Sequence, residues 1–140
     1  MPHSPNSDHR LLAIGGVLAG LGVAMGAFSA HLLRGRVAPD MLDVVRLGAQ
    51  YELLHAIAIV AVAGAMSHFH RARLRAACWL FVAGIVLFSG SLYALGLTGT
   101  RAFGAITPLG GLAFIAGWIM VVLGARRRED GKAGGREDGK

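Results

Sequence analysis

Four long runs of apolar residues divide the chain, and short polar segments separate them. The runs cover about residues 11–33, 50–67, 76–97 and 107–125. The hydrocarbon core of a bilayer needs roughly 20 residues of apolar helix, so each run suits one membrane-spanning helix. The pattern predicts an all-α, integral membrane four-helix bundle over residues 11–125, between a polar, disordered N-terminus (1–10) and a polar, disordered tail (126–140).

The segment between the first two runs has a helical pattern of its own. Pro39 suits a first helical turn, and Asp43, Arg46 and Gln50 share one helix face. We expect this segment to lie in the membrane interface before the chain turns inward at about Gln50. At the start of the fourth run, Thr107 suits an N-cap and the following proline suits a first helical position.

Small residues recur at helical spacing inside the runs. In lipid no hydrophobic drive brings helices together, so small residues that let two backbones approach closely supply the packing contacts. We therefore expect eight glycines to pack helices against one another: Gly16, Gly20, Gly22, Gly26, Gly84, Gly110, Gly117 and Gly124.

Composition and charge agree with a membrane protein. Apolar residues make up 54% of the chain and charged residues only 16%, too few to cover a soluble domain of this size. The net charge of +6 comes from the loops and tail, so we attribute it to topology and expect no nucleic-acid partner. Ten Lys and Arg lie on the side of the termini and the central loop and four on the other, which predicts that both termini are cytoplasmic. The single cysteine, Cys78, excludes an intramolecular disulfide and a multi-cysteine zinc site.

Polar residues within the runs are the candidate chemistry. Because neighbouring spans are antiparallel, we expect these residues to meet in the outer half of the bundle: His31, Tyr51, Glu52, His55, Ser89, Ser91, Tyr93 and Thr107. A charged group inside a membrane needs a partner. For Glu52 the available partners are His31, Tyr93, Ser89 and Arg46.

Two functions of different classes fit this cluster. The first is a non-enzymatic protein in which the cluster is structural or binds a partner, either a second copy of the chain or another membrane protein. The alternative is an oligomeric transporter or channel subunit that handles protons or a cation through His31, Glu52 and His55. The same three groups make a weaker zinc set, since the chain has one E-x-x-H motif where di-metal bundles use two. Hydrolase and cofactor motifs are absent, so we expect no enzyme, metal or cofactor.

Four stretches resemble a known family: "MGAFSAH" (25–31), "YELLHA" (51–56), "GIVLFSGSLYAL" (84–95) and "GAITPLGGLAFIAGW" (104–118). The chain is similar to domain-of-unknown-function family 423, whose animal relative is transmembrane protein 256. The resemblance implies a small four-helix membrane protein with no established activity. The richness in Ala, Gly and Arg is typical of a GC-rich genome and favours a bacterial cytoplasmic (inner) membrane. The family pattern has Gly in place of Ser29 and Gln in place of Glu52, which implies hydrogen bonding at position 52 and not a shared titrating carboxylate.

Overall fold

The computed structural model describes residues 6–125, and these residues form helices joined by short loops. The elements in chain order are α1 (Asn6–His31), α2 (Pro39–Ala65), α3 (Arg71–Gly84), the π-helical segment η1 (Ile85–Ser89), α4 (Gly90–Thr98), the 3₁₀ segment η2 (Arg101–Ala105) and α5 (Thr107–Gly124). Four stretches are long and apolar enough to cross a membrane: His9–His31, Pro39–Ala65, Arg71–Thr98 and Arg101–Gly124. The predicted all-α membrane fold with four spans is confirmed. The predictions for residues 1–5 and for the tail lie outside the described residues.

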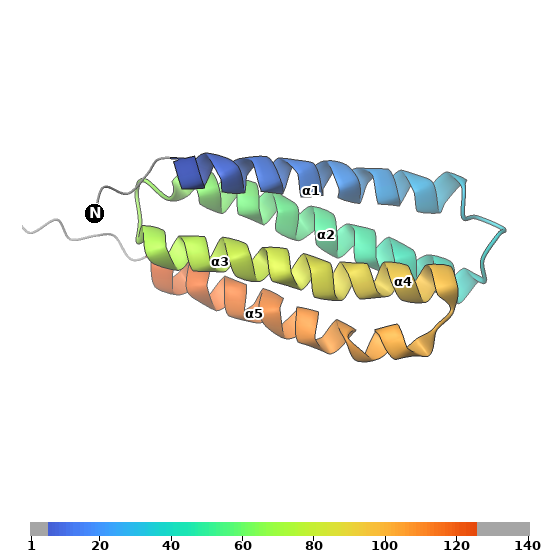
Figure 1. Ribbon diagram of the computed structural model, residues 1–140. Coiled ribbons are helices and arrows are strands. Elements are labelled where there is room, and N and C mark those ends of the chain that lie inside the picture. Colours follow the sequence, from blue (N-terminus) through green and yellow to red (C-terminus); the bar gives the residue numbers. More distant parts are fainter. Residues whose placement is uncertain (1–5, 126–140) are drawn as a thin grey trace, which may run out of the picture.

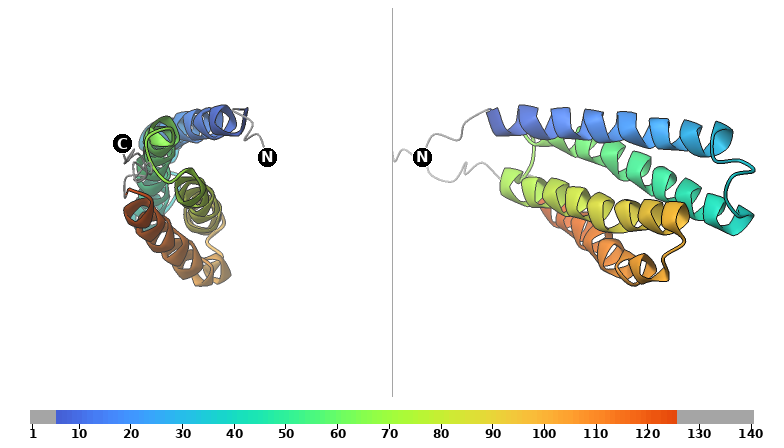
Figure 2. Two further views of the ribbon diagram at one scale, coloured as in Figure 1. Left: turned by 90° about the vertical axis from the view of Figure 1, so that its left-hand side faces the viewer. Right: turned by 45° about the vertical axis from the view of Figure 1, so that its right-hand side comes forward.

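The four spans run up and down in chain order (Figure 1). α2 lies between α1 and the helix formed by α3, η1 and α4, whereas α5 packs on α3 and η1. The end-on view in Figure 2 shows α1 and α5 on opposite flanks. The end where α1 begins and α5 ends is called the inner end, after the orientation that the charge distribution predicts. There the backbone N–H of His70 donates to Gly124 O over 3.2 Å and Arg73 Nη1 donates to Leu123 O over 2.8 Å. These bonds close the end of α5 against the start of α3.

The second span differs from its predicted form. A single continuous helix, α2, runs from Pro39 to Ala65, so the prediction of a separate interfacial segment before Gln50 was wrong. Hydropathy indicates where a helix meets lipid, whereas the helix itself begins at the proline that occupies its first turn. The charges that suggested an interface, Asp43 and Arg46, pair with each other over 3.3 Å on the exposed side of this helix. Consequently Glu52 is the middle residue of α2 and does not lie near its start.

Glycines let α5 approach α3 closely. A Cβ at Gly117 would lie 2.5 Å from the ring of Phe81, and one at Gly110 would lie 2.7 Å from Cα of Phe88. Gly84 and Gly124 also abut side chains, of Phe114 and Leu74. Close approach of the two backbones is therefore possible only without a side chain at these positions.

On α1 the glycines divide between two faces. Gly15 and Gly22 lie against α2, the latter with its Cβ direction 3.1 Å from the backbone nitrogen of Leu53. At Gly16, Gly20 and Gly26, by contrast, an added Cβ would have nothing within 4 Å. We expected all three to pack helices, and within residues 6–125 they do not, because α2 is the only extensive neighbour of α1 in that range. Spacing identifies a small-residue face but not which face has a neighbour.

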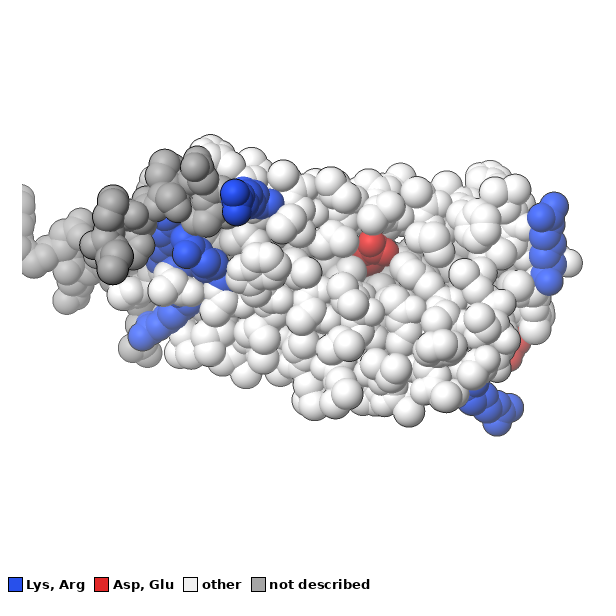
Figure 3. All heavy atoms as spheres, viewed as in Figure 1, with Lys and Arg blue, Asp and Glu red and all other residues white. Residues whose placement is uncertain are grey.

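Charged side chains gather at the two ends of the molecule, as Figure 3 shows for the face in view. The surface between them is white except for one red, acidic patch near its middle. The apolar core lies in the inner half, around Ile59, Cys78 and Phe81, all wholly buried. An acidic group in the middle of an apolar surface needs a hydrogen-bonding or charged partner.

Candidate functional site

Glu52 and Tyr93 form the first part of the site. The Tyr93 hydroxyl donates to Oε2 of Glu52 over 2.5 Å, a length typical of bonds to a charged acceptor. Glu52 is 4% exposed. The phenol ring is held in place because it lies against Gly48, where a Cβ would be 2.9 Å from Tyr93 Cε1. Tyr93 is one of the four hydrogen-bonding partners expected for Glu52 from the sequence, and it is the one that the structure shows.

The second carboxylate oxygen of Glu52 has a different environment. No residue between Asn6 and Ala125 donates a hydrogen bond to Oε1. Within the described residues, Oγ of Ser89 is fully enclosed and lacks a hydrogen bond. Oε1 of Glu52 also lacks one, but it is not fully enclosed. Oε1 therefore keeps some contact with the surroundings, at the seam where α1 and α4 both lie on α2.

His55 forms the second part of the site, one turn along α2 from Glu52. Its Nδ1 lies 2.8 Å from the carbonyl oxygen of Tyr51, and Trp118 directs its indole N–H at Nε2 over 3.3 Å. A carbonyl only accepts and an indole N–H only donates. His55 is therefore neutral, with its proton on Nδ1, and both ring nitrogens are committed to hydrogen bonds.

Aromatic rings enclose His55. Its imidazole stacks on Phe114 with centroids 3.6 Å apart and planes 9° from parallel, and Phe81 and Trp118 lie at an angle to it. Tyr51 stacks on the same histidine at 5.9 Å. His55 is 3% exposed. The imidazole is thus packed between α2 and α5, and neither ring nitrogen is free to bind a metal or transfer a proton.

Ser91 and Thr107 form the third part, between α4 and α5. Ser91 Oγ donates to the carbonyl of Phe88 over 2.9 Å, and the Ser91 and Thr107 hydroxyls are 2.8 Å apart. Because the Ser91 proton is used on a carbonyl, Thr107 must be the donor between the two hydroxyls. This bond ties the start of α5 to α4.

The remaining predicted site residues lie apart from these three pairs. Ser89 is wholly buried, and its hydroxyl has no partner in the described residues. His31 is exposed. Since Gly22 abuts Leu53 and His31 is nine residues farther along α1, His31 lies about 12 Å farther toward the outer end than Glu52. The predicted association of His31 with Glu52 and His55 was wrong.

The depth of the cluster also differs from the prediction. Ser91, Tyr93 and Thr107 belong to the outer half, but Glu52 is the middle residue of α2 and His55 lies farther inward. The reason is the extra length of α2 on its outer side. A carboxylate here lies deep in the spanning region, where an unpaired charge costs roughly 2.5–3.5 kcal/mol on insertion scales.

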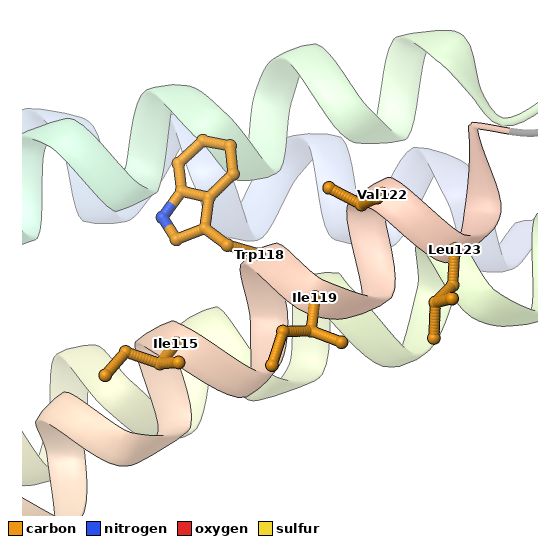
Figure 4. A pocket seen from close by; sticks show the side chains of 5 residues that line it. All are labelled: Ile115, Trp118, Ile119, Val122 and Leu123. Carbon is orange, nitrogen blue, oxygen red and sulfur yellow. The ribbon is translucent and has the colours of Figure 1, made fainter.

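Trp118 and Phe114 were not predicted from the sequence. The only signal was an indole in the middle of an apolar run, since tryptophan belongs more often at the interface. Figure 4 shows Trp118 leaving α5 toward α2, above an apolar hollow lined by Ile115, Ile119, Val122 and Leu123. That hollow has no polar group besides the indole, and no group of three or more His, Cys, Asp or Glu able to hold a metal occurs between residues 6 and 125.

Comparisons with known proteins agree with the membrane fold. Residues 25–111 match the family model described as "Protein of unknown function (DUF423)". The chain is 45% identical over 115 residues to the UPF0382 membrane protein YwdK of Bacillus subtilis, covering 81% of this chain and 94% of that protein. It is 37% identical over 111 residues to the UPF0382 inner membrane protein YgdD of Escherichia coli, covering 75% and 80%. No solved structure matches.

Proposed function

Because the chain belongs to the DUF423 family, we propose that it is a non-enzymatic, multi-pass protein of the bacterial cytoplasmic (inner) membrane that binds a partner inside the bilayer through Glu52 and Tyr93. The location follows from its four apolar spans and from the name of its inner-membrane relative. The binding role follows from the geometry of the carboxylate.

The observation that carries the proposal is the half-satisfied carboxylate. Glu52 lies deep in the spanning region, with Oε2 bonded to Tyr93 and Oε1 without a protein donor in the part of the chain that the structure describes. Hydrocarbon offers no hydrogen bonds, so a polar group left open to lipid costs free energy. A partner that brings a polar group to this depth removes that cost. Oε1 is therefore the atom that the partner would meet.

The other two parts of the site are better explained as helix-to-helix links. His55 has both nitrogens bonded and both ring faces covered, and Ser91 and Thr107 bond each other. Interhelical bonds of this kind contribute roughly 0.6 kcal/mol each. The transport alternative needs His31, Glu52 and His55 to act together. The distance of His31 from the other two and the apolar inner core argue against it.

Photocrosslinking in native membranes tests the binding role. Met25 of α1 is half-buried, lies three residues beyond Gly22, lines an apolar hollow, and packs against the same small apolar cluster as Tyr93. A benzophenone amino acid at Met25 should give a protein adduct that Glu52→Leu removes and Glu52→Gln keeps, because the amide retains an acceptor. The same probe at Ile14, also half-buried and about 16 Å deeper along α1, is the matched control. Lipid adducts alone, or a protein adduct indifferent to Glu52→Leu, would overturn the proposal.

A further inference from the structure

We propose that the partner at Glu52 is a second copy of this chain, whose Gln50 completes the site by hydrogen bonding to Oε1. This inference rests on the proposed binding role and adds the identity of the partner. Any donor to Oε1 must reach the depth of Glu52.

Depth restricts which groups a second copy can offer. Copies inserted in the same orientation and associated in the plane of the membrane keep each residue at one depth. Gln50 and Glu52 are two residues apart on α2, which is about 3 Å along the helix. Gln50 is exposed and makes no hydrogen bond within residues 6–125. Tyr51, the other exposed polar residue at this depth, has its ring packed against Phe88, 4.6 Å between centroids.

The amide of Gln50 suits the carboxyl group chemically. An amide carries two N–H donors and a carbonyl acceptor. It can therefore donate to Oε1 of a carboxylate, or accept from Oε1 of a protonated acid. The pairing holds in either protonation state, and it holds with Gln at position 52.

The surfaces around the two residues also correspond in depth. Gln50 stands on an exposed ridge of α2 together with Leu47, 43% exposed, and Leu54, 54% exposed. α1 carries an apolar hollow lined by Ala24, Met25, Ala27, Phe28, His31 and Leu32, of which Met25 and Phe28 pack against the same small cluster as Tyr93. Since Gly22 lies level with Leu53, this hollow lies level with the outer half of α2. The neighbour's Leu47 can enter the hollow while its Gln50 reaches Glu52.

The two surfaces lie on nearly opposite sides of the molecule. Gln50 and Glu52 are about 200° apart around α2. The ridge of one copy therefore meets the seam of the next, which is a heterologous contact. Such contacts generate closed rings or open rows and not a two-fold dimer.

Disulfide trapping between two differently tagged chains tests this arrangement. Both chains carry Cys78→Ala and are purified and reconstituted together in liposomes without other proteins. One carries Gln50→Cys and the other Met25→Cys. We expect a disulfide between the two tags on mild oxidation, and little between Gln50→Cys and Ile14→Cys, which lies about 16 Å deeper than Met25. No disulfide for the first pair, or equal yields for both pairs, would overturn the proposal.

A second measurement keeps the result independent of cysteine geometry. Association of labelled chains in liposomes, followed by energy transfer, should weaken about 3- to 18-fold with Gln50→Leu, the equivalent of one interhelical hydrogen bond. Ile57→Leu, on the exposed side of the same helix, should leave it unchanged. Unchanged association with Gln50→Leu contradicts the inference. If the Met25 photoadduct forms in native membranes but not in these liposomes, the partner is another protein: the binding role stands and this inference fails.

Discussion

The imidazole of His55 and the ring of Phe114 lie face to face, with centroids 3.6 Å apart and planes 9° from parallel. His55 belongs to α2 and Phe114 to α5, two helices otherwise separated by α3 and η1. The same imidazole accepts from Trp118 at its Nε2. The neutral side chain of His55 thus joins α2 to α5 by stacking and by a hydrogen bond.

Replacing Trp118 with Phe should test the hydrogen-bonded half of this link. Trp118→Phe keeps an aromatic ring but leaves Nε2 of His55, a buried acceptor, without its donor. We expect a loss of about 1 kcal/mol in the free energy of unfolding, measured by denaturation in a single detergent. Trp79→Phe, on an indole that is 53% exposed, is the matched control and should change little. Equal effects of the two changes would show that ring volume matters and the bond does not.

At the Glu52–Tyr93 pair, Glu52→Gln should leave the free energy of unfolding nearly unchanged, whereas Tyr93→Phe should lower it. Tyr93→Phe keeps the ring against Gly48 but removes the donor to Glu52, so the free energy of unfolding should fall by roughly 0.6–1.7 kcal/mol. Glu52→Gln keeps an acceptor and should be nearly neutral. Both are measured by the same denaturation assay. A proton-handling site makes the contrary prediction, in which Glu52→Gln abolishes proton flux in liposomes and leaves stability intact.

Two adjacent glycines of α5 offer a test of close packing. A Cβ at Gly110 would meet the backbone of Phe88, whereas at Gly111 nothing lies within 4 Å. Gly110→Ala should therefore cost about 1–3 kcal/mol of stability through overpacking. Gly111→Ala should be neutral or stabilising, since alanine favours the helix by up to about 1 kcal/mol. Similar melting temperatures for the two variants would argue that α5 does not approach α3 as described.

Orientation in the membrane is a further prediction, from the ten-to-four distribution of Lys and Arg. Thr100 lies in the exposed loop after α4, and His68 lies in the exposed loop before α3. In a Cys78→Ala background, Thr100→Cys should react with an impermeant maleimide on intact cells, and His68→Cys only after the membrane is opened. The reverse order of labelling would place both termini outside.

The sequence predicts the four spans because apolar length alone decides what crosses a bilayer. It does not predict that the helix opened by Pro39 continues unbroken past Gln50 into the second span, since helix continuation depends on backbone hydrogen bonds and not on hydropathy. This error placed Glu52 at an interface instead of at mid-helix. The register between helices, which brings Trp118 to His55 and leaves His31 at the outer end, depends on pairs of surfaces and is not encoded in the spacing within one helix.

The π-helical segment, Ile85–Ser89, has a consequence for how the third span can vary in length. There the N–H of Gly90 bonds the carbonyl of Ile85, five residues back, so the turn holds one residue more than an α-helical turn. Removing one residue from this turn, such as the exposed Val86, would convert it to regular helix without turning α3 relative to α4. A deletion elsewhere in α3 or α4 would rotate everything after it by about 100°. A single-residue gap in related sequences should therefore align within this turn.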